Sequence, residues 1–515
     1  MVTTHLNTAT ADTHLARDRG RALLAALAVY FLLQLLVRVT VAGGVEKDEA
    51  EQLLWTQTLA WGYGPQPPLY SWLQWAVFRL TGPTVFGLAL LKNALLFATY
   101  ALTWAAARWL LAPAPAALAA ASLLLLPQIA WESQRDLTHT VLVTTAAAAT
   151  LWLAIGLLQR PSTPRYAGLG VALAAGALAK YSFLLVPLAL AGAALPDRRL
   201  RAALLDRRLL LSVAVAVLLV APHGLWLTGH WHDATHVTAG KLELQPGGAL
   251  EHALGGVASL ALAAVAFLTP LWIVYAALFG RALWRERPAR ADNPWPAFFG
   301  RYFALLGGAL LLLALAGAGN FKDRWMQPLL FCAPLAVLVA RPDVATPERL
   351  RTLRRVLAGT ALVLLLGMVG RVLAVGHGQR PGDFNLPLGP LGEVLRARGV
   401  RPAAVIAESS RLAGGMRLVF PGAAVRVVDR TGPPPGPGPL LLIATPPERF
   451  EALRAADPAW TGLLPMQPGD VLSTEASMAA LEDWVGFRPL TGLDEGIARF
   501  AEWFRRYRAG GGASA

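Results

Sequence analysis

An apolar run, LLAALAVYFLLQLLVRVTVA at residues 23–42, is followed by an acidic and aromatic segment, VEKDEAEQLLWTQTLAWGYGPQPPLYSWL at residues 45–73. The apolar run has the length of about 20 residues with which an α-helix crosses roughly 30 Å of hydrocarbon. Four carboxylates stand directly behind it: Glu46, Asp48, Glu49 and Glu51. The sequence therefore predicts a membrane-spanning helix that delivers these carboxylates to one membrane surface.

The composition extends this interpretation to most of the chain. The 515 residues are 55% hydrophobic and 15% charged, whereas soluble domains carry about 25% charged residues. The formal net charge of +14 is typical of nucleic-acid binding as well, but the arginines lie in short loops between apolar runs. The positive-inside rule expects them there. We therefore predict an integral membrane protein with no nucleic-acid partner.

The N-terminal residues and the single cysteine bear on the kind of membrane protein. Residues 17–21, RDRGR, precede the first apolar run as in a signal peptide, but the run exceeds the usual length and no A-x-A site follows. We expect an uncleaved helix, with residues 1–21 in the cytoplasm. Cys332 lies among apolar residues, which predicts a buried core position and excludes an internal disulfide.

Loop charge predicts about eleven transmembrane helices over residues 22–375. The ambiguous stretch is 166–195. As one helix, it would place the arginine-rich loop that follows it outside. As two short helices meeting near Lys180, it places this loop and the later basic loops inside. The second interpretation puts the first external loop, residues 43–83, on the outer face of the membrane.

The sequence changes character from Gly376. Short β-rich runs, AAVIAESS, VRVVD and LLLIATP, alternate with mixed segments and are interrupted by TGPPPGPGP. Such runs between turn-forming segments are typical of strands. We predict a small periplasmic α/β domain over residues 376–464, followed by a distinct tail over residues 465–515.

The acidic segment is the first candidate site. A helix that begins near Asp48 would place Asp48 and Glu51 on one face and Glu49 about 100° away. Charge runs are often solvated, and we expect Glu46 and Glu51 to face solvent. The aromatic and proline-rich continuation, however, suits a groove at the membrane boundary. The candidate groove residues from this loop are Trp61, Tyr63, Gln66 and Tyr70.

A second external loop, WESQRDLTH, contributes Arg135, Asp136 and His139 as candidates. The alternative is a polar turn in which Asp136 or Thr138 caps the next helix. Lys92, within an apolar run, has two equally open interpretations, a functional cation or a structural bond between helices.

Further cations are predicted on the same face. Lys180 stands between two apolar segments, where an ionisable group is costly and is by default a functional hypothesis; snorkelling to the surface is the alternative. Lys322 and Arg324 in FKDRW run against the positive-inside rule. An anionic ligand would account for them, since Lys and Arg are the usual partners of phosphate.

A metal site is a weaker hypothesis. In HWHDATH, His232 and His236 have the i, i+4 spacing that chelates a metal on a helix. No helix is evident there, and loop histidines are commonly solvated. No cofactor is therefore assigned, although a divalent metal remains an option.

With these motifs, the sequence resembles the polytopic, lipid-phosphate-sugar-dependent glycosyltransferases of the GT-C superfamily. The nearest branch is that of the protein O-mannosyltransferases and the lipid A aminoarabinose transferase. The match covers about residues 20–460, and its specific elements are DEAEQLLWTQTLAWGYGPQPPLYSWL, GALAKYSFLL and FKDRWMQPLLF. The resemblance implies inverting transfer of a hexosyl or pentosyl group from a polyprenyl-phosphate donor to a periplasmic acceptor, which would be lipid A, a glycan or a protein.

The resemblance also implies roles for individual residues. Asp48 and Glu49 would be the acidic pair of the first external loop, with Asp48 orienting or deprotonating the acceptor. The donor phosphate would be bound by a set of cations: Lys180, Lys322, Arg324 and Arg135. Two positions depart from the family, because Gln66 stands where aminoarabinose transferases have lysine, and His139 where many relatives have aspartate. The acceptor therefore stays open.

The tail carries a second resemblance. Met466–Tyr507 is similar to the C-terminal end of UDP-glucuronate epimerases. The chain has no glycine-rich dinucleotide loop and no Tyr-x-x-x-Lys pair, so epimerase activity is not implied. For the whole chain, the alternative to a glycosyltransferase is a non-catalytic protein that binds or translocates polyprenyl phosphate, because this too would need the cations.

Overall fold

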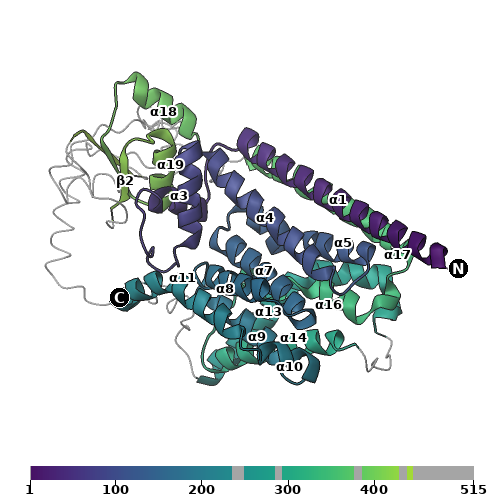
Figure 1. Ribbon diagram of the computed structural model, residues 1–515. Coiled ribbons are helices and arrows are strands. Elements are labelled where there is room, and N and C mark those ends of the chain that lie inside the picture. Colours follow the sequence, from purple (N-terminus) through teal and green to yellow (C-terminus); the bar gives the residue numbers. More distant parts are fainter. Residues whose placement is uncertain are drawn as a thin grey trace. The chain divides into compact units, whose positions relative to one another are not determined.

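The structure is a computed structural model, shown in Figure 1. The chain divides into two units, Met1–Leu463 and Leu464–Ala515. The second unit, with the predicted tail, lies outside the described residues. Those that the structure describes are 2–232, 234, 249–284, 293–375, 386–428 and 438–444.

Long apolar helices make up most of the first unit. Over the described residues, seven are long and apolar enough to cross a membrane, and an eighth is formed if the bent pair Pro113–Leu125 and Gln128–Arg135 counts as one span. The pair is bent by 73° at Pro127, where the proline cannot supply a helical hydrogen bond. The seven helices are α1 (Val2–Val41), α4 (Val85–Ala107), α7 (His139–Gln159), α11 (Leu209–Gly229), α13 (Ala249–Phe279), α14 (Trp295–Leu315) and α17 (Pro347–Val375).

The predicted polytopic helical fold is confirmed, but three of the eleven predicted spans are short helical segments. These are α8 (Thr163–Ala177), η3 with α9 (Tyr181–Ala194), and α15 with α16 (Gln327–Ala340). Each is shorter than the roughly 20 residues of a full crossing. The first two are the short segments that the sequence predicted to meet near Lys180, so only α15 with α16 departs from the predicted spans.

The predicted break at Lys180 is present. Helix α8 ends at Ala177, and the chain resumes as a helix at Tyr181. A Cβ atom on Gly176 would lie 2.3 Å from the ring of Phe183, so the glycine allows the ring to pack against the end of α8. The break leaves Lys180 in extended backbone.

Small residues and hydroxyls bring the helices together, as is common in membranes. A Cβ on Gly170 would lie 2.6 Å from the carbonyl oxygen of Ser212, which reflects the close approach of α8 and α11. Between α4 and α7, the hydroxyls of Thr99 and Thr145 share a hydrogen bond of 2.8 Å.

The described residues after α17, 386–428 and 438–444, contain a three-stranded parallel sheet of order β2-β1-β3. We call this part the outer domain, after its predicted location. All three predicted runs form strands: β1 (Ala404–Ala407), β2 (Ala424–Val427) and β3 (Leu440–Ile443). Helices α18 (Leu388–Ala397) and α19 (Ser410–Val419) accompany the sheet. The predicted small α/β region is therefore present, although most of TGPPPGPGP lies outside the described residues.

Helix α19 of the outer domain packs on α2 (Lys47–Trp55), the helix of the acidic segment. A Cβ on Gly414 would lie 2.6 Å from the backbone of Ala50, and Arg417 donates to a backbone carbonyl of α2 at 2.6 Å. Just after α2, the side-chain amide of Gln57 pairs with both backbone groups of Val425, at 2.6 and 2.7 Å. The amide thus occupies the free edge of β2, and the outer domain holds α2 from one side.

Candidate functional site

Glu49 on α2 lies in a buried ion triad. It is 1% exposed, and its carboxylate accepts from Arg38 of α1 and from Lys92 of α4, each at 2.7 Å. Burial alone would raise the pKa of Glu49, but the two cations outweigh it and hold the pKa below its ordinary value. Glu49 is therefore ionised, and of the two interpretations of Lys92 the bond between helices is the one present.

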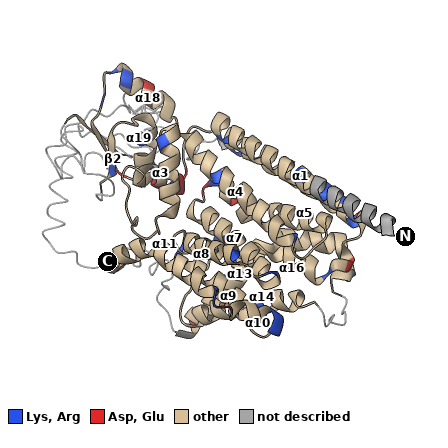
Figure 2. Cartoon of the chain, in the orientation of Figure 1, with Lys and Arg blue, Asp and Glu red and all other residues tan. Residues whose placement is uncertain are grey.

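Glu46 is buried as well, so the expectation that it faces solvent is wrong. Its carboxylate accepts from Arg371 of α17 at 2.9 Å and lies 3.7 Å from Arg135. Arg371 is 325 residues away in sequence, which is why the local pattern did not reveal the pair. We call the two acids and their four cations the neutralised cluster: Glu46, Glu49, Arg38, Lys92, Arg135 and Arg371. Figure 2 shows charged segments of both signs near α3 and α4.

Asp48 and Asp136 form a different arrangement, which we call the open pair. The backbone N–H of Asp48, in the first turn of α2, donates to Oδ1 of Asp136 at 2.8 Å. Asp136 thus satisfies an N–H group at the start of α2, where helices leave such groups unpaired. The predicted capping of α7 is not present, because Thr138 occupies the N-cap position without a side-chain hydrogen bond.

Neither carboxylate of the open pair forms an ion pair within the described residues, although Lys92 donates to the backbone carbonyl of Asp136 at 3.4 Å. Burial, and then the charge of Asp48, raise the pKa of Asp136 to about 7. The carboxylate of Asp48 is partly exposed, and within the described part of the chain it has no hydrogen bond or ion pair. It is therefore available to a substrate.

Tyr70 lies beside both groups of acids. It is fully buried on α3 (Leu69–Thr81), and its hydroxyl has no hydrogen-bond partner among the described residues. Burial, followed by the charges of Glu49 and Asp48, raises the pKa of Tyr70 well above its ordinary value. The hydroxyl therefore stays protonated and can donate to a ligand.

His139 connects Tyr70 with the rest of the predicted groove. The two ring centroids are 5.4 Å apart, and Nε2 of His139 lies 3.2 Å from the amide nitrogen of Gln52. Trp55 packs between His139 and Tyr63, with centroid distances of 6.1 and 6.0 Å. Gln52 and Trp55 were not predicted as site residues. They follow Asp48 by four and seven residues, the spacing of side chains on one face of a helix.

Trp61 and Gln66 shape the loop after α2. Trp61 is 55% exposed and packs edge-on against Trp72 at 5.6 Å. Gln66 pairs through its backbone with Tyr63, at 3.3 and 3.4 Å. Neither makes a hydrogen bond to the open pair, so their predicted contact with substrate stays a prediction.

Lys180 reaches the start of α7. Its ammonium group donates to the hydroxyl of Thr140 at 3.1 Å, next to His139 in the chain. The break between α8 and η3 therefore places this cation at the aromatic side of the site.

Lys322 and Arg324 flank Asp323 in η5 (Asp323–Met326). Asp323 accepts from Gln128 of the bent span at 2.7 Å, which places η5 beside the segment that leads to Arg135. In the described structure, the side chains of Lys322 and Arg324 have no acidic partner. Their charges are open to an anion.

No group of three His, Cys, Asp or Glu residues that could hold a metal ion occurs in the described parts of the chain. Asp233 and His236 of HWHDATH lie outside them, and so does the predicted metal pattern.

Comparison with known proteins shows the family of this chain. Residues 65–226 match the model of the dolichyl-phosphate-mannose-protein mannosyltransferases. The lipopolysaccharide core galacturonosyltransferase RgtB of Rhizobium johnstonii is 38% identical over 453 residues, 84% of this chain and 90% of the relative. RgtA of the same organism is 34% identical, with the same two shares. The chain belongs to the family of the lipopolysaccharide core galacturonosyltransferases.

This family member is therefore a membrane glycosyltransferase, as predicted. Its fold is similar to the crystal structure of ArnT from Cupriavidus metallidurans bound to undecaprenyl phosphate, with a TM-score of 0.55 over 84% of this chain and 88% of that one. At 15% identity the likeness concerns the fold alone, and it confirms the GT-C class. A probable UDP-glucuronate 4-epimerase of Rhizobium meliloti is 33% identical over 136 residues, 26% of this chain and 37% of the relative, a match longer than the tail, residues 465–515, in which the resemblance was predicted.

Proposed function

We propose that this glycosyltransferase moves a galacturonosyl group from a polyprenyl-phosphate carrier to the core of lipopolysaccharide, on the periplasmic face of the inner membrane. The 38% identity with RgtB across 90% of that protein carries the choice of sugar and acceptor. The open cations beside the membrane end of the site support a phosphate-linked donor.

The chemistry follows from the unequal carboxylates. An acceptor hydroxyl attacks the anomeric carbon of the donor, the bond from this carbon to the phosphate oxygen breaks, and the phosphate leaves on its lipid. The hydroxyl proton passes to the carboxylate of Asp48, which has no ion pair to displace. Tyr70 donates a hydrogen bond to the sugar or the acceptor, and Asp136 holds the turn that carries Asp48.

In this scheme Glu49 is a positioning residue. Its two oxygens are taken by Arg38 and Lys92, so a proton transfer to Glu49 would break a buried triad. The cations of the donor site are Lys180, Lys322 and Arg324, which hold the departing phosphate.

A reconstituted reaction tests the proposal. Purified protein is mixed with lipopolysaccharide that lacks core galacturonate and with polyprenyl-phosphate galacturonic acid, and the product is weighed by mass spectrometry. We expect one galacturonosyl group to be added to the core. Transfer from UDP-galacturonic acid without the lipid donor would overturn the donor, and transfer of a neutral hexose in place of galacturonate would overturn the sugar.

Substitution of the cations tests the phosphate site separately. Lys180→Gln and Arg324→Gln should each raise the KM for the lipid donor about tenfold, since a charge-assisted hydrogen bond contributes about 1.5–3 kcal/mol. Arg355→Gln, on the exposed face of α17, makes the same charge change and should leave this KM unaltered. An unchanged KM in the first two variants removes them from the site.

A further inference from the structure

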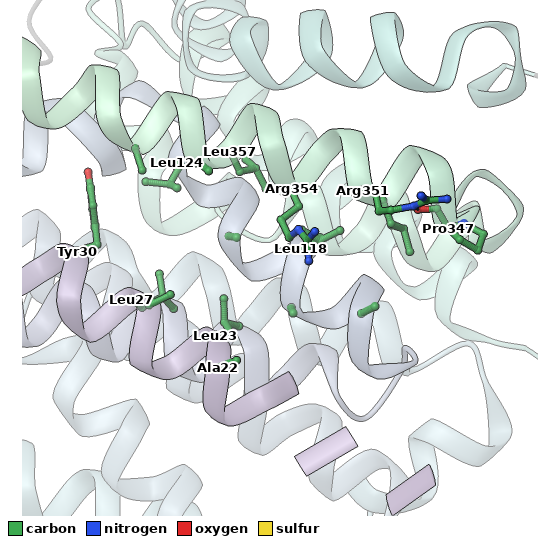
Figure 3. Close-up of a pocket in the computed structure, with 17 residues that line it drawn as sticks. Ala22, Leu23, Leu27, Tyr30, Leu118, Leu124, Pro347, Arg351, Arg354 and Leu357 are labelled. Atoms are coloured by element: carbon green, nitrogen blue, oxygen red, sulfur yellow. The ribbon is translucent and has the colours of Figure 1, made fainter. Parts of the chain in front are cut away.

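An apolar groove lies between α1, α5 (Pro113–Ala121) and α17 (Figure 3). It lies where the apolar span of α1 begins, at Gly20, and where α17 begins, at Pro347. Its volume of about 760 Å³ is within the roughly 300–1,000 Å³ of small-molecule sites. Leucines form its walls, among them Leu23, Leu27, Leu118 and Leu357. Alanines on all three helices leave the space between them.

The lining is charged at one end only. Figure 3 shows Arg351 and Arg354 toward Pro347, and Tyr30 at the opposite end. The described residues that line the groove include no acid. Arg351 pairs with the exposed Glu348 at 3.1 Å, whereas Arg354 is exposed and forms no ion pair with any described residue. The groove therefore combines long apolar walls with a cationic mouth.

The mouth lies far from the carboxylates of α2. Helices α1 and α17 both run from the groove to the neutralised cluster, where they supply Arg38 and Arg371. Arg354 precedes Arg371 by 17 residues on α17, about 26 Å at 1.5 Å per residue. This is close to the roughly 30 Å thickness of the hydrocarbon core. The groove and the carboxylates consequently face opposite leaflets.

We infer that the groove binds an anionic phospholipid of the cytoplasmic leaflet, with its acyl chains between α1 and α17 and its phosphate on Arg351 and Arg354. Charge complementarity selects an anionic headgroup. The glycosyl donor does not fit this position, because a phosphate at Arg354 would lie about 26 Å from the acids at the other end of α17.

The bound lipid has a structural consequence. The lipid joins α1 and α17, whose far ends supply Arg38 to Glu49 and Arg371 to Glu46. In the protein alone, 22% of the α1 span and 17% of the α17 span are buried. Filling the groove supplies the packing contacts that α1 and α17 lack there. The lipid therefore stabilises the helix pair on which the neutralised cluster depends.

Lipid binding by delipidated protein tests this inference and needs no transfer activity. The full chain in detergent is mixed with phosphatidylglycerol or phosphatidylethanolamine, and bound lipid and the thermal midpoint are measured by native mass spectrometry and by unfolding. We expect phosphatidylglycerol to bind at least tenfold more tightly than phosphatidylethanolamine and to raise the midpoint.

The variants separate the headgroup from the acyl chains. Arg351→Gln with Arg354→Gln should remove the preference for phosphatidylglycerol, while Arg355→Gln, next in the chain but not lining the groove, should keep it. Ala26→Leu, which fills the groove without changing charge, should weaken both lipids. Equal binding of the two lipids, or the same loss in the Arg355 variant, overturns the inference. Displacement of phosphatidylglycerol by equimolar undecaprenyl phosphate would overturn the choice of a phospholipid.

Discussion

The neutralised cluster and the open pair meet at the first turn of α2. The carboxylates of the two groups have opposite surroundings. Each acid of the cluster is buried against two cations. Asp48, between Glu46 and Glu49 in the chain, has no ion pair in the described structure. The carboxylate of Asp136 accepts the backbone N–H of Asp48, and the charge of Lys92 lowers its pKa without outweighing burial. A strongly raised pKa, as at Asp136, is common in functional sites. The contrast separates the ion-paired carboxylates from Asp48, for which we propose the chemical role.

Helical geometry produces the contrast from adjacent residues. Side chains at i and i+1 point about 100° apart, so Glu49 faces the membrane helices while Asp48 faces the open side. The cations come from α1, α4 and α17. The cluster therefore ties three spans to α2 and fixes the direction of Asp48.

Asp48→Asn should have the largest effect, because the amide keeps the shape of the side chain but cannot take a proton. We expect transfer to fall by about 10²–10⁴-fold, with donor binding within about twofold of the wild type. The measurement is the initial rate of glycosyl transfer, paired with donor binding. Glu51→Gln, which removes a charge 3.9 Å from Lys47 and keeps the shape of the side chain, is the control and should stay near wild type. Full transfer by Asp48→Asn would contradict the assigned role.

Glu49→Gln should mainly affect stability. It leaves Arg38 and Lys92 buried without their carboxylate, and breaking a buried pair costs about 3–5 kcal/mol. The thermal midpoint in detergent should drop sharply. A second change, Lys92→Met, removes one of the two unpaired cations and should restore part of the loss. If the single variant unfolds like the wild type, the cluster does not support the fold.

Asp136→Asn should change the pH dependence of transfer. In the wild type we expect the rate to fall as the pH drops through about 7, because protonation of Asp136 weakens the acceptor that holds the N–H of Asp48. The asparagine variant still accepts this bond but does not titrate, so its rate should be lower by a few fold and flat near pH 7. Glu132→Gln, in the same loop, should retain the wild-type pH profile. If this variant also loses the fall in rate at low pH, the fall belongs to a group other than Asp136.

Stability should respond to Asp136 in the opposite direction. Its folded-state pKa lies above the ordinary value of 3.8, so between these values the folded state binds more protons than the unfolded state. The free energy of unfolding therefore decreases as the pH rises from about 4 to 7. Asp136→Asn should remove this decrease, and unfolding midpoints across that range would show it.

Local patterns predicted the features that depend on neighbours in sequence. The charges of the loops predicted the helix break at Lys180, and β-rich runs predicted the three strands. The spacing of Asp48 and Glu49 predicted their different directions. By contrast, apolar length did not distinguish a full span from the short pair α15 with α16, since composition does not report where a helix ends.

The ion pairs could not be predicted in the same way, because their partners are distant in the chain. Arg38 within the first span was the available signal, since a cation at membrane depth is costly without a partner. Glu46 with Arg371, and Gln57 with Val425, join residues separated by 325 and 368 positions. A single sequence has no periodicity that connects them.

Gln57→Ala should give the smallest effect and tests whether the open pair also depends on the outer domain. It removes the two hydrogen bonds to Val425 at the edge of β2 and a third, at 2.9 Å, to the carbonyl of Leu54 in α2, without touching a charge. At about 0.5–1.5 kcal/mol for each bond, we expect a few-fold loss of transfer and faster hydrogen exchange in α2. Gln66→Ala, in the same loop, is the matched control. If exchange in α2 is unchanged in the Gln57 variant, the membrane cations alone orient Asp48, and the outer domain is not needed for the contrast between the two groups of acids.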